Sequence, residues 1–152
     1  MTTLKQKLIH ILGAAGLLPF LGSALAELMD VTLPYKVQPV DLLMTYGAII
    51  LSFLSGVLWG RALHRADSEP TNGLLLLSNA FALLAWVTLL LDSVFWTLLI
   101  QMLGFALVLI SERKLARGST MTTQLGYYPM RLSLTVAVIV CQLLVFGNHL
   151  FL

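Results

Sequence analysis

The stretch that decides the fold runs from Leu42 to Leu63 and reads LLMTYGAIILSFLSGVLWGRAL, with no charged residue before Arg61. At about 1.5 Å of rise per residue, these roughly 22 residues form a helix about 33 Å long, enough to cross a bilayer. Small residues recur at every fourth position in it, at Ala48, Ser52, Gly56 and Gly60. This spacing places them on one helix face, where another backbone can approach closely in lipid. We therefore expect a central membrane helix that packs through these four residues against the first helix.

The composition of the whole chain requires lipid as its main solvent. Of its 152 residues, 59% are hydrophobic and only 11% are charged, with a mean hydropathy of +0.92. Soluble domains carry about 25% charged residues. The basic residues form no stripe apart from the loops between apolar runs, so nucleic acid is not an expected partner. Cys141 is the only cysteine, which excludes a disulfide within one chain and a cysteine-based metal site.

Apolar runs separated by polar loops predict an all-α, integral membrane bundle of five transmembrane helices in a single domain, residues 1–152. The expected helices cover residues 8–28, 42–63, 74–91, 94–110 and 132–152, and the sequence allows the fourth to extend to residue 116. The short Asp92-Ser93 turn predicts that the third and fourth helices form an antiparallel hairpin.

The first apolar run has two interpretations. Basic residues before it and Ala24-Leu25-Ala26 ahead of Glu27 are typical of a cleavable signal peptide, which would remove about residues 1–26. Pro19 and a row of small residues instead favour a retained, packed helix, with a kink at Pro19 because proline cannot donate a hydrogen bond to the preceding turn. We favour the retained helix.

The distribution of charge predicts the topology. With a cytoplasmic amino terminus, one side of the membrane holds Lys5, Lys7, Arg61, Arg65, Arg113, Lys114, Arg117 and Arg131, and the other side holds Lys36 alone. The outer side instead gathers the acids Glu27, Asp30, Asp41 and Asp92. The positive-inside rule therefore places the amino terminus in the cytoplasm and the carboxyl terminus outside.

No arrangement of reactive residues predicts catalysis, a metal site or a cofactor. His10 and His149 are expected at opposite ends of the bundle, so they cannot ligate one haem at a common depth. His64 follows Ser55 by about 13 Å along a helix, too far for a base that must lie about 3 Å from its nucleophile. The sequence thus leans against an enzyme without excluding one.

A rim of aromatic and basic residues is the candidate site for a lipid headgroup or a partner. Trp59 and Arg61 end the second predicted helix, and Tyr128 and Arg131 precede the fifth. Aromatic rings settle at the headgroup level and arginine pairs with phosphate, so simple anchoring in the bilayer is the alternative.

Several segments resemble the transmembrane protein 69 family, an uncharacterised family of small polytopic proteins of bacterial and mitochondrial inner membranes. The segments are Leu12-Gly13, Gly16-Leu17-Leu18-Pro19-Phe20, Tyr46-Gly47-Ala48, Ser52-Phe53-Leu54-Ser55-Gly56, Trp59-Gly60, Leu84-Ala85-Trp86, Tyr128, Arg131 and Leu134-Thr135. The Ser55-Gly56 pair departs from the Gly-Gly that such proteins often carry. The resemblance implies a multi-pass protein of the cell inner membrane and implies no activity.

Two classes of function remain open. The first is a non-catalytic protein that binds partners or helps to assemble other membrane proteins, which the absence of a catalytic constellation favours. The second is a binder or carrier of a small amphiphile, a lipid or a quinone, which the Pro19 kink, the apolar-span amides Asn79, Gln101 and Gln142, and the aromatic–arginine rim favour.

A reporter fused after Leu152 tests the topology. We expect activity only from a reporter that works outside the cytoplasm, because the excess of positive charge holds the opposite loops inside. Cytoplasmic activity in a chain that still carries residues 1–26 would show that the orientation is inverted.

Overall fold

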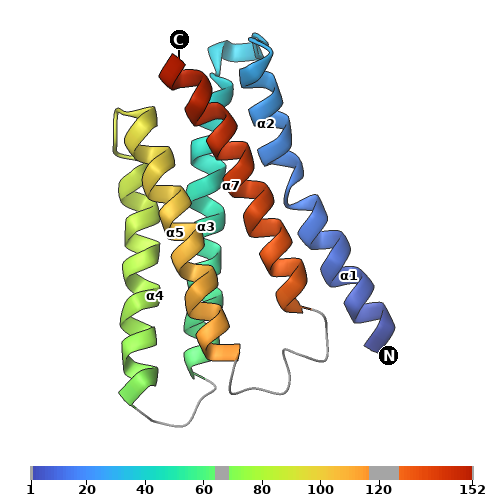
Figure 1. The fold of residues 1–152 in the computed structure, drawn as a ribbon, viewed down its shortest axis with the longest axis vertical. Coiled ribbons are helices and arrows are strands. Elements are labelled where there is room, and N and C mark those ends of the chain that lie inside the picture. The colour runs from blue at the N-terminus through green and yellow to red at the C-terminus, as the bar shows by residue number, and fades with distance from the viewer. Residues whose placement is uncertain (1, 64–68, 117–126, 152) are drawn as a thin grey trace.

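The computed structural model describes residues 2–63, 69–116 and 127–151 (Figure 1). The regular structure of these residues is helical: α1 (Thr2–Ala15), α2 (Leu18–Leu28), the 3₁₀ turn η1 (Pro34–Lys36), α3 (Pro39–Leu63), α4 (Glu69–Thr88), α5 (Val94–Ala116) and α7 (Tyr127–Phe151). Four stretches are long and apolar enough to cross a membrane: Lys7–Leu28, Pro39–Leu63, Val94–Lys114 and Tyr128–Leu150. A shorter apolar helix, Asn72–Thr88, accompanies them, so an all-α membrane bundle is confirmed.

Proline explains where several helices begin. Each of the five prolines lies within the first three residues of a helical element, where its missing N–H is not needed and its fixed φ fits the helix. For this reason α3, α4 and α7 begin three to five residues before the expected starts at residues 42, 74 and 132. At its other end α4 stops at Thr88 rather than at residue 91, and α5 takes the longer of its two expected lengths.

The first membrane span is divided into α1 and α2 at Gly16-Leu17, with Pro19 in the first turn of α2. Pro19 has no N–H to donate to the preceding turn, which favours a break at this point. The hydroxyl of Tyr46 on α3 donates to the Gly16 carbonyl at 3.1 Å. A carbonyl at the broken turn thus receives a partner from a neighbouring helix, as the hydrocarbon environment requires.

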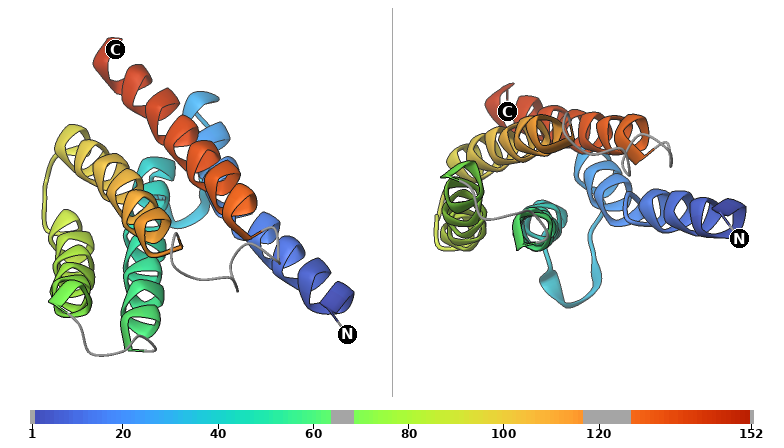
Figure 2. Two further views of the ribbon diagram at one scale, coloured as in Figure 1. Left: turned by 60° about the horizontal axis from the view of Figure 1, so that its bottom comes forward. Right: turned by 90° about the horizontal axis from the view of Figure 1, so that it is seen from below.

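The helices pack side by side around α3 and α5. Helix α3 contacts α2, α4 and α5, while α7 contacts α5, α2 and, more weakly, α1 (Figure 2). Both views show α1 leading away from the bundle below the break (Figure 2). The described chain ends lie at opposite ends of the bundle (Figure 1).

The face of α3 that enters the core is not the one expected. Its buried residues are Pro39, Val40, Leu43, Gly47, Ala48, Leu51, Leu54, Ser55, Leu58 and Ala62. Of the small-residue row only Ala48 is buried; Ser52 and Gly56 are exposed. A Cβ added at Gly56 or Gly60 would meet no described atom within 4 Å. The prediction that this row packs helix two against helix one is therefore wrong for Ser52 and Gly56, because the core takes the neighbouring residues one position away.

A buried amide network joins four helices in the half of the bundle that holds the connection between α4 and α5. The Gln101 amide nitrogen on α5 donates to the Met44 carbonyl on α3 at 2.8 Å and to the Thr88 hydroxyl on α4 at 3.1 Å. Its amide oxygen accepts from Gln142 on α7 at 2.8 Å. Gln101 and Gln142 are both completely buried, whereas the third amide, Asn79, is exposed and donates to a carbonyl of its own helix.

Gly47 makes room for this network. A Cβ at this position would overlap the Gln101 amide oxygen and lie 3.2 Å from the Gln142 amide nitrogen. Glycine is thus required here by the close approach of two side chains rather than by backbone conformation.

Two matched substitutions on α3 distinguish its core face from its outer face. We expect Gly47→Ala to lower the melting temperature in detergent, because the added methyl displaces the Gln101–Gln142 hydrogen bond. Gly56→Ala should leave the melting temperature unchanged or raise it slightly, since alanine is favoured over glycine in a helix by about 1 kcal/mol. Equal loss of stability in both variants would show that the outer face also packs against protein.

Candidate functional site

Three charged side chains meet at the end of the bundle formed by the starts of α1 and α7 and the ends of α3 and α5, called the basic end. The Arg131 Nε donates to Glu112 Oε2 at 3.1 Å, and its Nη1 donates to the Thr135 hydroxyl at 3.3 Å. The Arg61 Nη1 lies 4.0 Å from Glu112 Oε1. Three helices, α3, α5 and α7, therefore contribute to one group, which we call the Glu112 cluster: Arg61, Glu112, Arg131 and Thr135.

The cluster is buried to an extent that is unusual for charged side chains. Glu112 is 1% exposed and Arg131 is 7% exposed. Such residues are rarely buried unless they are paired, because removing a charge from water is costly. The short Arg131–Glu112 contact supplies that pairing.

The pairing within the cluster is incomplete. Among the described residues, Arg131 Nη2 and Glu112 Oε1 are buried without a hydrogen-bond partner. The buried Arg131–Glu112 pair thus keeps one unused donor and one unused acceptor.

An apolar cleft begins at this cluster. Its volume is about 160 Å³, and it is lined by Leu12, Gly13, Gly16, Leu17, Phe20, Ile50, Phe53, Leu54, Phe105, Arg131, Leu134, Thr135 and Val138. Within this lining, Arg131 and Thr135 are the polar side chains. Phe20 lies between Tyr46 and Phe105, with ring centroids 4.9 and 6.2 Å away, and forms a rigid part of the wall.

The structure brings two of the four expected rim residues together and places the other two elsewhere. Arg61 and Arg131 are brought together, on the same end of the bundle and on the same carboxylate. Tyr128 instead packs against Arg113: the Cζ atom of Arg113 lies over the Tyr128 ring, 5.8 Å from the ring centroid. Trp59 is 40% exposed on the outer side of α3, a position suited to bilayer anchoring.

The sequence analysis missed two members of the site, the hydroxyl of Thr135 and the charged side chain of Glu112. Glu112 is the one for which the sequence holds a signal. It stands in the last turns of an otherwise apolar span, immediately before Arg113 and Lys114. An acid inside a membrane span calls for a partner, and that signal was present in the sequence. The neighbouring basic residues masked it, because they allow the acid to be read as part of a solvated helix end.

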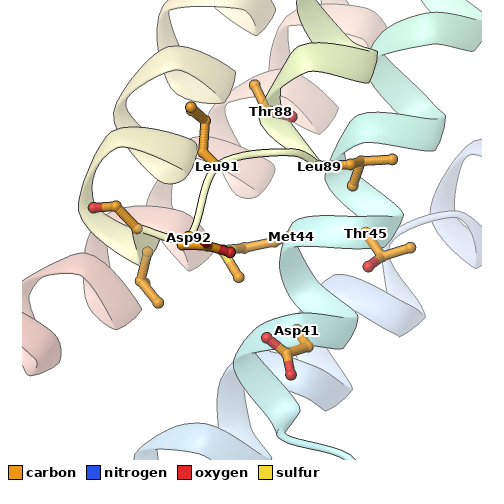
Figure 3. Close-up of a pocket in the computed structure, with 9 residues that line it drawn as sticks. Asp41, Met44, Thr45, Thr88, Leu89, Leu91 and Asp92 are labelled. Carbon is orange, nitrogen blue, oxygen red and sulfur yellow. The ribbon is translucent and has the colours of Figure 1, made fainter.

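The opposite, acidic end has a polar pocket of its own (Figure 3). It measures about 360 Å³ and is lined by Asp41, Met44, Thr45, Thr88, Leu89, Leu91, Asp92, Ser93 and Val94. Thr88 connects it to the buried Gln101. The described residues contain no group of three or more histidine, cysteine, aspartate or glutamate side chains that could hold a metal ion.

Glu27, at the same acidic end, has a structural role. One of its carboxylate oxygens accepts from the Val40 N–H at the start of α3 at 2.9 Å, and the other lies 2.7 Å from His149 Nε2. A carboxylate at a helix amino terminus is stabilising, and this one also joins α2, α3 and α7.

Substitutions in the Glu112 cluster test its pairing. We expect Glu112→Leu to destabilise the protein strongly, on the order of 3 kcal/mol, because it leaves the Arg131 guanidinium buried without its carboxylate. The double variant Glu112→Leu with Arg131→Leu should recover part of the lost melting temperature. Lys114→Leu, an exposed cation on the same helix, is the control. A double variant less stable than the sum of the two single variants would contradict the pairing.

Sequence comparison identifies relatives of this chain. Residues 5–147 match the family described as protein of unknown function (DUF3429). Transmembrane protein 69 of Xenopus tropicalis is 45% identical over 80 residues, which cover 52% of this chain and 31% of that protein. No solved structure matches. The family match covers nearly the whole chain, and the resemblance read from its motifs agrees with it: the chain belongs to the DUF3429 family and is similar to transmembrane protein 69.

Proposed function

We propose that the protein binds a membrane amphiphile in the apolar cleft, with the polar head of the amphiphile at Arg131. The observation that carries the proposal is that Arg131 and Thr135 supply the polar side chains in the lining of an otherwise apolar cavity. An apolar cavity with a few convergent polar groups is the usual form of a ligand site.

The size of the cleft indicates how much of the amphiphile it holds. Drug-sized ligands occupy pockets of about 300–1,000 Å³, well above the volume of about 160 Å³ found here. The cleft therefore accommodates a segment of one chain next to the head, and the remainder of the molecule stays in the bilayer.

The mouth of the cleft is suited to entry from the membrane. Leu12 on α1 and Phe53 on α3 both line the cleft and are exposed at its edge. Helix α1 leads away from α3 below the break at Gly16-Leu17 (Figure 2). An amphiphile can thus slide in sideways without leaving lipid.

The charge of the two ends supports a location and an orientation. Arg61, Arg113, Lys114 and Arg131 lie at the basic end, and Glu27, Asp30, Asp41 and Asp92 lie at the other. We propose the cell inner membrane as the location, with the basic end toward the cytoplasm.

Substitutions that fill the cleft test this function by native mass spectrometry of the protein purified in mild detergent. We expect a retained amphiphile in the wild-type protein and its loss from Leu134→Trp, because the larger side chain occupies the cleft. Leu132→Trp is the matched control, since Leu132 is an exposed apolar residue on the same helix outside the cleft lining.

The same experiment separates the proposal from its main competitor, a partner-binding or assembly role. The exposed face of α3 around Gly56 favours that competitor, because a second backbone could approach there. Stoichiometric protein partners without any retained amphiphile would establish the competitor and overturn amphiphile binding.

A further inference from the structure

One amide in the bundle, Asn79 on α4, lies on the outside of the protein. We infer that two copies of this chain associate through the outward face of α4, with Asn79 of one copy hydrogen-bonded to the same residue of the other copy. The inference concerns a different part of the molecule from the amphiphile cleft, and it does not depend on the proposed function.

Asn79 takes no part in the interior amide network. Gln101 and Gln142 are buried and hydrogen-bonded to each other, whereas Asn79 is exposed. Among the described residues, its one side-chain hydrogen bond runs from Nδ2 to the Leu75 carbonyl of its own helix, at 3.0 Å. An asparagine amide has two donor N–H groups and an acceptor oxygen, so Asn79 keeps one N–H and its oxygen for a further partner.

The position of Asn79 along α4 keeps it away from water. It lies seven residues after Asn72 and nine residues before Thr88, which bound the apolar part of this helix. At about 1.5 Å of rise per residue these separations are roughly 10 and 14 Å, so a side chain as short as asparagine does not reach the headgroups. Hydrocarbon offers no hydrogen bond, and an amide at this depth therefore calls for a protein partner.

Asn79 belongs to a regular row of exposed residues, which we call the α4 seam. The row lies on the side of the helix opposite the buried Phe81 and Ala85. Its members are spaced alternately by four and three positions: Asn72, Leu76, Asn79, Leu83 and Trp86. Leu76 is 74% exposed and Leu83 is 63% exposed, so the row forms the centre of the outward face. This spacing is that of a coiled-coil interface, along which two helices pack side by side in water and in lipid.

Hydrogen-bond complementarity indicates that the partner helix is α4 of a second copy. The asymmetry of positive charge along the chain gives every copy one orientation in the membrane, so two α4 helices run parallel and place Asn79 at a common depth. Because an amide carries both donors and an acceptor, two asparagines across a two-fold axis satisfy each other. A single asparagine in such a row also fixes the register of a parallel helix pair.

The place of α4 in the bundle leaves the seam accessible. Helix α4 packs against α3 and α5, and both views show it at the edge of the bundle on the side away from α1 (Figure 2). A second copy can therefore reach the seam without displacing a described helix. The amphiphile cleft is lined by residues of α1, α2, α3, α5 and α7 and by none of α4, so association leaves it open.

Cysteine cross-linking of the full-length chain in membranes of the expressing cells locates the contact. We expect Leu76→Cys and Leu83→Cys to form a disulfide-linked dimer under mild oxidation, because identical residues of the seam meet at the two-fold axis. Leu103→Cys is the matched control, since Leu103 is an exposed leucine on α5, outside the seam. The unsubstituted chain sets the background, because its one cysteine, Cys141, is buried.

Substitution of the amide measures its contribution to association. Energy transfer between donor-labelled and acceptor-labelled chains in lipid vesicles gives the protein-to-lipid ratio at which half of the chains are associated. We expect Asn79→Leu to raise this ratio about tenfold, which corresponds to about 1.4 kcal/mol, because the hydrogen bond between the copies is lost. Asn79→Gln keeps an amide and should restore association. The melting temperature of Asn79→Leu in detergent should stay close to that of the wild type, since the side chain is exposed.

Four outcomes would overturn the inference. The first is a monomer at every protein-to-lipid ratio, and the second is a dimer that cross-links through Leu103→Cys and not through Leu83→Cys. The third is association that is unchanged in Asn79→Leu, because the amide would then make no contact between copies. The fourth is a different protein cross-linked to Leu83→Cys in place of a second copy. Leu134→Trp should leave association unchanged, so the amphiphile proposal and this inference stand or fall separately.

Discussion

The fold depends on the hydrogen bonds of Gln101. In the hydrocarbon core a polar group finds no water, so each polar side chain there must be satisfied by protein. Gln101 meets this constraint by donating to α3 and α4 and accepting from α7, while itself standing on α5. Lipid supplies no hydrophobic force that would press these helices together. One side chain consequently fixes the relative depth of four helices, and Gly47 must stay small to leave it room.

The cleft is a consequence of the break between α1 and α2. A continuous helix from Lys7 to Leu28 would lie against its neighbours along its whole length. The break at Gly16-Leu17 instead keeps α2 in the bundle, where Phe20 and Ala24 join the core, and lets α1 lead away. The Tyr46 hydroxyl on the Gly16 carbonyl holds this arrangement at the point of divergence. The space that remains between α1, α3 and α7 is the cleft that ends at Arg131.

The glutamates at the two ends of the bundle, Glu27 and Glu112, differ in how completely their carboxylates are hydrogen-bonded. At the acidic end Glu27 joins three helices through a backbone N–H and His149, and both of its oxygens have partners. At the basic end Glu112 is more deeply buried and satisfies only one oxygen by a hydrogen bond among the described residues. Both oxygens of Glu27 are therefore paired at the acidic end, whereas a buried donor and a buried acceptor remain unsatisfied at the basic end. That difference is the physical reason to place the candidate site at the basic end.

Sequence alone determined that lipid is the main solvent and where each helix approximately lies, because length and hydropathy are local properties. It also determined the break near Pro19 and the common end of Arg61 and Arg131, because these follow from the positions of proline and of charged residues along the chain. It placed the starts of α3, α4 and α7 three to five residues too late, although the first turn of a helix accepts Pro39, Pro70 and Pro129. Only the tertiary structure decided which face of α3 is the core. In lipid both faces of a helix are apolar, so the spacing of Ala48, Ser52, Gly56 and Gly60 does not by itself fix the side on which the rest of the bundle lies. The pairing of Arg131 with Glu112 also required the structure, since it joins residues of two helices whose relative rotation follows from the packing around Gln101.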